Sequence, residues 1–307
     1  FFLSLRRGEL AETYWLFHPC ITITWGQALI LWLQSLGSNL PLESFVEFQM
    51  AHLAGSVGPM RLSGVLLTSL ALPVVYLGAR PLLGRWPAIL GVGLLSVNPF
   101  WVAHSRIVNG DALAGVLMVA AYLVFALLLV RPRLKMAALS GLLVGLSLLT
   151  KLPSQILVPL IGMLAVIGAL IHRNWKFWLK ALLLCGLVSA ATFVLLWPAM
   201  WVAPVDTLLM MVEDTFAVGD IGGKDKVEFF WGQIRERQSS WFYPVALLFR
   251  LTPVNLTGAA LTLGLLITAY APRLFAGKIQ ARSQQPENRA VRGDQGPAVI
   301  RAVALLW

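Results

Sequence analysis

The sequence predicts an all-α fold, a polytopic transmembrane helical bundle of the kind that spans a lipid bilayer several times. Of its 307 residues 58% are hydrophobic and only 12% are charged, and the mean hydropathy is +0.76. In an ordinary soluble domain about a quarter of the residues are charged. Short charged loops divide the apolar stretches, and a helix needs roughly 20 apolar residues to cross the hydrocarbon. We therefore expect an integral, multi-pass membrane protein.

Uncharged stretches between these loops predict seven complete spans. They cover residues 62–79, 86–105, 112–130, 136–150, 152–172, 181–205 and 251–272. An eighth apolar run begins near residue 297 and stops at Trp307, and the chain opens inside apolar sequence without a signal-peptide pattern. We interpret the chain as a fragment that is truncated at both ends.

The distribution of charge predicts the orientation of these spans. Of the 24 Lys and Arg residues, 13 fall in four loops at residues 80–85, 131–135, 173–180 and 273–292, which the positive-inside rule places in the cytoplasm. The opposite face receives 12 of the 14 carboxylates. The net charge of +10 is therefore a signal of topology and does not indicate a nucleic-acid partner. We expect the chemistry on the extracytoplasmic side.

The segment before the first span is amphipathic and too polar to cross the bilayer. Residues 21–36 and 42–53 are expected to form helices on the outer leaflet; the alternative is a loop packed on the bundle. The expected organisation is an outer-face segment at 1–60, a bundle of six spans at 61–197, a large extracytoplasmic loop at 198–243, a span at 244–272, a cytoplasmic linker at 273–296 and the start of the truncated span at 297–307.

Two short outer-face motifs contain side chains that could carry chemistry. His18 and Pro19 combine a titratable ring with a rigid turn, although a histidine there can also simply bond to a helix start. The motif HSRIVNGD carries His104, Arg106 and Asp111 around an Asn-Gly turn. Arg106 and Asp111 could form an ion pair, or bind a phosphate and a sugar hydroxyl respectively. Ionisable residues at the membrane edge are functional candidates by default.

Lone cations and an aromatic cluster add further candidates. Lys151 and Arg250 interrupt apolar sequence on the side opposite to the basic loops, so each needs an anion, either a protein carboxylate or a lipid phosphate. Snorkelling to the headgroups is the structural alternative. Phe229 and Phe230 could rest on a sugar or on lipid, as part of a mobile lid or of an interfacial aromatic belt. Neither cysteine has a partner at metal-binding spacing.

Several motifs resemble those of bacterial family 39 glycosyltransferases. HPCITITWG resembles their HPG-V-T-T-W stretch, HSRIVNGDALAGVLM their SR-x-x-x-x-D element and LSLLTKLPSQILVP their L-T-K-x-P hairpin, while WPAMWVAPVDTL, FFWGQI and FYPVALLFRLTP are similar to their large outer loop and the span after it. The matches follow the family's order over residues 5–272.

This resemblance implies an inverting GT-C glycosyltransferase of the protein O-mannosyltransferase and aminoarabinose-transferase superfamily, in a bacterial inner membrane with its active site facing outward. The donor would be a sugar on a polyprenyl-phosphate carrier, and the acceptor a hydroxyl of a protein, a lipid or a glycan. A carboxylate must deprotonate that hydroxyl and cations must hold the phosphate. Asp111 and Arg106 are the catalytic candidates, while Lys151, Arg250 and Arg106 are the phosphate ligands.

The remaining expectations concern the base, the cavity and the metal. His18, Pro19, His104, Phe229 and Phe230 would line the cavity. The family's base is an acidic residue expected before Phe1, and Glu9 and Glu12 are the nearest acids present; Lys224, Asp225 and Lys226 replace a histidine found in many relatives. The sequence identifies no cofactor with certainty, and a divalent metal remains open.

A transporter or a lipid-linked sugar flippase is the alternative function. Transporters carry acids or broken helices near the membrane midplane, whereas the predicted spans here are almost free of acids.

Overall fold

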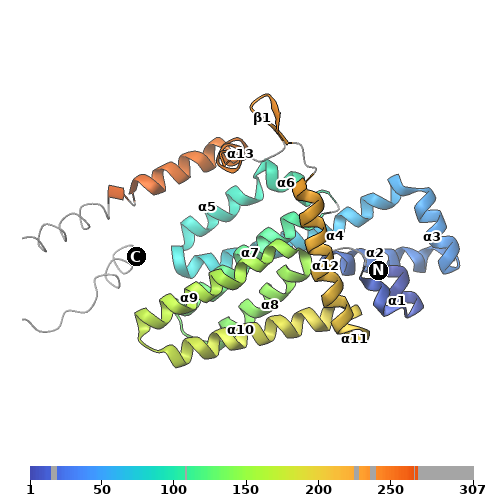
Figure 1. Ribbon diagram of the computed structural model, residues 1–307, viewed down its shortest axis with the longest axis horizontal. Helices are drawn as coiled ribbons and strands as arrows, with labels where there is room; N and C mark the ends of the chain where they lie inside the picture. The colour runs from blue at the N-terminus through green and yellow to red at the C-terminus, as the bar shows by residue number, and fades with distance from the viewer. Residues whose placement is uncertain (15–18, 108, 225–227, 236–239, 266, 269–307) are drawn as a thin grey trace, which may run out of the picture. The chain divides into compact units, whose positions relative to one another are not determined.

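The computed structural model describes residues 1–14, 19–107, 109–224, 228–235, 240–265 and 267–268. It divides into two compact units, Phe1–Lys226 and Val227–Trp307, which are considered separately. The predicted linker at 273–296 and the truncated span at 297–307 lie outside the described residues. In the first unit every regular element is helical (Figure 1).

The N-terminal elements of the first unit are short or amphipathic helices. They are α1 (Phe2–Arg7), the 3-10 helix η1 (Leu10–Thr13), α2 (Ile21–Ser38) and α3 (Leu42–Ala51). α2 and α3 match the two helices that the sequence predicts before the first span. Pro41 precedes α3 and Gly8 ends α1 with a φ of 76°, a backbone conformation that glycine adopts without a steric penalty.

The bundle that follows is helical throughout the six spans predicted between residues 62 and 205 apart from short breaks. It consists of α4 (Leu53–Leu83), α5 (Arg85–Ser96), α6 (Pro99–Ser105), α7 (Asp111–Ala126) with η2 (Leu127–Leu129), α8 (Leu134–Thr150), η3 (Leu152–Ile156), α9 (Leu157–His172), α10 (Trp175–Leu196), α11 (Ala199–Val202) and α12 (Pro204–Lys224). Four helical stretches of the described chain are long and apolar enough to cross a membrane, or six if each of two bent pairs forms one span; α8, at 17 residues, is a shorter apolar helix. The predicted count of seven complete spans therefore stays a prediction.

Prolines explain where the helices depart from the predicted bounds. The stretch predicted as one span at 86–105 is two helices, α5 and α6, bent by 60°. Asn98 accepts a hydrogen bond from the Trp101 amide and Pro99 occupies the first turn of α6, which is how a new helix begins. The span predicted to reach residue 205 ends at Leu196, because Pro198 cannot continue the α10 backbone bonding pattern.

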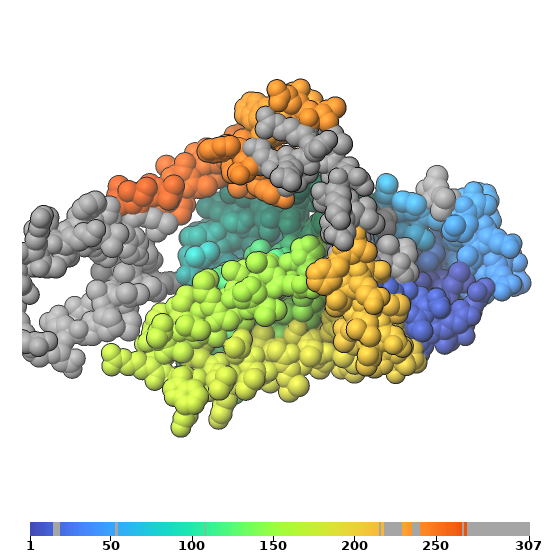
Figure 2. Space-filling view, viewed as in Figure 1, coloured from blue at the N-terminus to red at the C-terminus, as the bar shows by residue number. Residues whose placement is uncertain are grey.

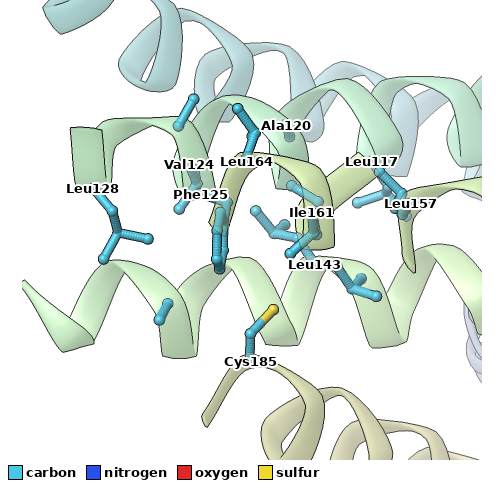
Figure 3. Packing of buried hydrophobic residues seen from close by; sticks show 14 of the residues in the cluster. Leu117, Ala120, Val124, Phe125, Leu128, Leu143, Leu157, Ile161, Leu164 and Cys185 are labelled. Atoms are coloured by element: carbon cyan, nitrogen blue, oxygen red, sulfur yellow. The ribbon is translucent and has the colours of Figure 1, made fainter. Parts of the chain in front are cut away.

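α7 lies at the centre of this unit. In its apolar stretch 67% of the residues are buried within the protein, compared with 22–39% in the other three continuous spans. α4 and α8 pack on α7, α10 packs on α8, and α9 lies beside α10 (Figure 1). Figure 3 shows Leu117, Val124 and Phe125 from α7 among side chains from α8 and α9. α7 is apolar around most of its circumference, as expected for the most buried helix of a bundle.

Small residues let α8 and α10 approach closely. A Cβ atom on Gly141 would lie 2.4 Å from the Cys185 carbonyl oxygen, and one on Gly145 would lie 2.6 Å from Thr192 Cβ. Ser140 donates a hydrogen bond to the Ala121 carbonyl oxygen at 2.9 Å, so the same helix is also tied to α7. Close backbone packing of this kind stabilises helix association in lipid, where apolar burial alone gives no preference.

The second unit, as described, contains a hairpin and two helices. Strands β1 (Glu228–Phe230) and β2 (Gln233–Arg235) pair antiparallel, with Phe229 opposite Ile234. α13 (Phe242–Arg250) and the helix Pro253–Leu265 follow, with a bend of 115° between them. The span predicted at 251–272 therefore begins two residues later, after a sharp break at Pro253.

Candidate functional site

An ion pair joins the start of α7 to the end of α8. Lys151 Nζ donates to Asp111 Oδ1 in a short contact, and the side chains are 20% and 39% exposed respectively. Asp111 is the first residue of α7 and Lys151 directly follows α8. Because consecutive antiparallel helices bring the start of one beside the end of the next, two charges far apart in sequence meet at one end of the bundle.

The turn before α7 holds the Asp111 carboxylate in place. Asn109 Nδ2 donates to Asp111 Oδ2 at 2.7 Å, and the Asp111 amide donates back to Asn109 Oδ1 at 3.2 Å. The carboxylate also lies at the N-terminal end of α7, where the partial positive charge of the helix attracts an acidic side chain. Lys151 is held by its backbone, which is extended at φ −159° between α8 and η3. Both charges are thus fixed by local structure.

The start of α2 completes this arrangement. Thr150 Oγ1 donates to Thr22 Oγ1 at 2.9 Å, and Thr22 lies near the α8 carbonyl of Leu146. A Cβ atom on Gly110 would lie 3.1 Å from the Thr150 carbonyl oxygen and 3.8 Å from Cys20 Sγ. A side chain at position 110 would therefore crowd the contact between this turn and the end of α8. We call Cys20, Thr22, Asp111, Thr150 and Lys151 the polar cluster.

The charges of the polar cluster act on the Cys20 thiol. Burial raises the pKa of its thiol above the usual value; the positive charge of Lys151 opposes this shift and the carboxylate of Asp111 adds to it. The thiol is therefore protonated near neutral pH. Pro19, just before it, is buried, whereas His18 lies outside the described residues.

A second set of contacts ties the N-terminal segment to the chain after α10. The Ala199 amide donates to Thr13 Oγ1 at 2.9 Å, and the Tyr14 ring stacks on Trp197 at 5.9 Å. The Tyr14 hydroxyl donates to Asp214 of α12 in a short bond. Burial and then this carboxylate raise the pKa of Tyr14. Figure 2 shows the gold α12 next to the blue N-terminal helices.

The sequence left two alternatives for Arg106 and Asp111 in the motif HSRIVNGD, an ion pair or separate binding roles, and the ion pair is not among those of the described residues. Asp111 pairs with Lys151 and not with Arg106, which is exposed at the C-terminal end of α6. Arg106 and Asp111 lie on opposite sides of a helix break, so closeness in sequence does not bring their side chains together. His104 Nδ1 lies 2.8 Å from the Phe100 carbonyl oxygen one turn earlier, and its ring packs on the Phe100 ring at 4.0 Å.

The other candidates are distributed over both units. Arg250 ends α13, and Phe229 and Phe230 lie in β1, all in the second unit. Phe230 contacts the rings of Trp231 and Phe242. Their roles stay predictions. Glu9 and Glu12 are exposed at η1, as expected for residues that face solvent on a short helix.

Sequence reasoning missed several members of the site. Thr22 and Thr150 carry no charge and were not singled out, although they lie in the motifs HPCITITWG and LSLLTKLPSQILVP. The Tyr14–Asp214 bond joins residues 200 positions apart, which no local pattern reveals. The Asp111–Lys151 pair had a usable signal, since two lone opposite charges flank one predicted helical hairpin at the same end. In the described residues no group of three or more His, Cys, Asp and Glu side chains is placed to hold a metal ion.

Comparison with known proteins gives one family. The family model described as dolichyl-phosphate-mannose-protein mannosyltransferase matches residues 44–200, just over half of the 307-residue chain, and this range contains both Asp111 and Lys151. No curated protein and no solved structure matches the chain. The all-helical bundle, its apolar spans and this match agree, and the chain belongs to the dolichyl-phosphate-mannose-protein mannosyltransferase family of membrane glycosyltransferases, which use a lipid-linked sugar donor.

Proposed function

We propose that this chain carries the donor site of an inverting glycosyltransferase that moves a sugar from a polyprenyl-phosphate carrier to an acceptor hydroxyl on the extracytoplasmic side. The observation that carries the proposal is the Asp111–Lys151 pair, a lysine at the end of a membrane helix with a carboxylate that is still partly open to solvent. The family description supports a protein hydroxyl as the acceptor. A bacterial inner membrane is the proposed location.

The reaction requires positive charge where the leaving phosphate develops negative charge. As the acceptor oxygen bonds to the anomeric carbon, the bond from that carbon to the phosphate oxygen breaks, and the electron pair stays on the phosphate. The proton of the acceptor hydroxyl passes to a carboxylate. Lys151 then stabilises the growing phosphate charge. Arg106 and Arg250 are proposed as further phosphate ligands.

In this proposal Asp111 has one role before the donor binds and another afterwards. Without donor, its carboxylate pairs with the Lys151 ammonium group at the membrane edge. When the phosphate replaces it on Lys151, Asp111 is released to accept a hydrogen bond from a sugar hydroxyl, while Asn109 still holds its other oxygen. Pro19, His18, His104, Phe229 and Phe230 are proposed to line the cavity.

Neutralising Lys151 tests the proposal. Lys151→Met keeps the apolar stem and removes a contact worth about 2 to 4 kcal/mol in the transition state, so sugar transfer from a polyprenyl-phosphate donor should fall roughly 30-fold to 1000-fold. Lys151→Arg should recover part of the rate, because it restores the charge with a different donor geometry. The measurement is single-turnover transfer by the purified full-length protein.

Lys180→Met is the matched control. Lys180 is an exposed lysine in the first turns of α10. The last turn of α10, and not the first, lies on the side of the bundle that holds Lys151, so Lys180 is far from the proposed site. Its loss should leave transfer unchanged. Near-normal transfer by Lys151→Met would assign Lys151 to headgroup contact and would refute its role in holding the phosphate.

A further inference from the structure

A cavity of about 440 Å³ lies between α4, α7 and α8 at the end of the bundle opposite the polar cluster. Its walls are apolar and include Leu77 and Pro81 of α4, Val124 of α7 and Leu139 of α8. A volume of this size lies in the range of about 300 to 1,000 Å³ that is typical of small-molecule sites. The cavity is therefore large enough to take part of an amphipathic molecule.

Three cations line the mouth of this cavity. Arg131, Arg133 and Lys135 come from five consecutive residues and are all exposed. The sequence contains no Asp or Glu between residues 112 and 205, or between 48 and 110. The two ion pairs found in the described part of the chain, Arg7–Glu43 and Lys151–Asp111, use none of these three cations. The mouth therefore has a surplus of positive charge.

The start of α8 adds to this surplus. Arg133 is its N-cap residue and makes no side-chain cap, and the first turn contains no acidic residue. A helix N-terminus carries partial positive charge and normally receives a capping oxygen or a carboxylate. Here Arg133 occupies the N-cap position and Lys135 lies in the first turn, so both positive charges oppose the helix dipole. An anion at the mouth would reduce the repulsion among the three cations and their repulsion with the N-terminus of α8.

The mouth lies at the depth of lipid headgroups. The stretch Asp111–Leu129 is 19 residues long, which corresponds to about 28 Å of helix. The hydrocarbon core is about 30 Å thick. With the polar cluster at one interface, the three cations lie at the other, and the apolar walls between α4, α7 and α8 lie within the acyl-chain region.

We propose that this cavity binds an anionic phospholipid. The phosphate meets Arg131, Arg133 and Lys135, and an acyl chain lies along Leu77 and Leu139. The apolar walls favour a lipid over a soluble phosphate. A zwitterionic lipid is disfavoured, because its ammonium group would meet only cations. The positive-inside rule explains why cations gather at this end, but it does not require three of them to converge on one cavity.

Lipid binding to the full chain in neutral detergent tests this proposal. Native mass spectrometry would measure the dissociation constants of phosphatidylglycerol, phosphatidylcholine and glycerol phosphate. Each cation near an anionic lipid surface contributes favourable binding free energy. The variant Arg131→Gln/Arg133→Gln/Lys135→Gln removes three such contributions and should weaken phosphatidylglycerol binding on the order of 100-fold at low salt. Leu139→Trp keeps every charge and narrows the cavity, so it should also weaken binding.

The variant Arg173→Gln/Lys176→Gln/Lys180→Gln is the matched control. It removes three charges from the same end of the bundle, at residues that do not line the cavity, and it should bind phosphatidylglycerol normally. If the first triple variant does not fold, the single variant Lys135→Gln and Leu139→Trp decide the question. Equal weakening in the control, equal affinity for phosphatidylcholine or glycerol phosphate, or unchanged binding by Leu139→Trp would each overturn the proposal.

Discussion

Asp111 is the residue whose contacts link the start of α7 to the rest of the candidate site. Its two oxygens have different partners, Lys151 on one and Asn109 on the other. Because 39% of its side chain is exposed, the pair is screened by solvent and its loss should cost the fold only about 1 kcal/mol or less. The same exposure leaves the carboxylate accessible to a ligand.

Replacing Asp111 by Asn separates its catalytic role from its structural role. The amide retains the shape and the contact with Asn109 but removes the charge beside Lys151. We expect sugar transfer to fall by roughly 100-fold to 1000-fold, while the folded yield changes little. Transfer rate and monodisperse yield from size-exclusion chromatography measure the two effects. Asp206→Asn, at an exposed first-turn carboxylate of α12, is the control. Equal losses of rate and yield would show that Asp111 is structural.

At the scale of helices, the contact between α8 and α10 depends on glycines. Gly141 faces the α10 backbone so closely that a Cβ atom would lie 2.4 Å from the Cys185 carbonyl oxygen and 3.0 Å from Cys185 Cα. Backbone atoms cannot move aside as a flexible side chain does, so the two helices would have to separate. α8 is also tied to α7 through Ser140 and Ser147, which makes its position critical for the core.

Gly141→Ala should therefore destabilise the protein. Overpacking of a close contact costs about 1 to 3 kcal/mol, which we expect as a lower unfolding temperature of the purified protein in detergent. Gly186→Ala on α10 is the control, because nothing lies within 4 Å of its added Cβ atom and alanine favours helix. A Gly141→Ala protein as stable as the parent would mean that α8 and α10 do not pack as closely as described.

At the scale of the whole molecule, the membrane imposes two chemically different ends on the first unit. The polar cluster lies where α7 begins and α8 ends, and the basic residues lie where α8 and α10 begin. His172 Nε2 lies 3.1 Å from the Leu129 carbonyl oxygen, so the end of α9 lies at the basic end too. Because successive helices run in opposite directions, the polar cluster and the basic residues lie at opposite ends of the bundle.

Labelling from one side of the membrane tests the predicted orientation. In a background with Cys20→Ala and Cys185→Ala, Asp206→Cys should react with a membrane-impermeant maleimide on intact cells. Lys180→Cys should react only after the membrane is permeabilised, because basic loops are retained in the cytoplasm. Both native positions are exposed, so access to reagent does not limit either reaction. The reverse pattern would invert the orientation and remove the extracytoplasmic active site.

By itself, the sequence determined the class of the fold, the approximate positions of the helices and the division of charge between the two ends. These follow from composition and local pattern, since any apolar stretch of sufficient length in lipid must satisfy its backbone hydrogen bonds within a helix. The helix starts at Ile21 and Leu42 and the helical stretch from Asp111 were predictable for the same reason. Pro198 could have marked the end of α10, because proline acts locally.

Only the tertiary structure decided which charges meet. Sequence proximity suggested a pair between Arg106 and Asp111, but the break between α6 and α7 separates them, and the hairpin of α7 and α8 brings Lys151 to Asp111 instead. Tyr14 and Asp214 likewise meet only because the N-terminal segment packs against Trp197 and α12. Such contacts depend on how helices pack, and packing depends on the shapes of many side chains at once, which no local pattern in the chain contains.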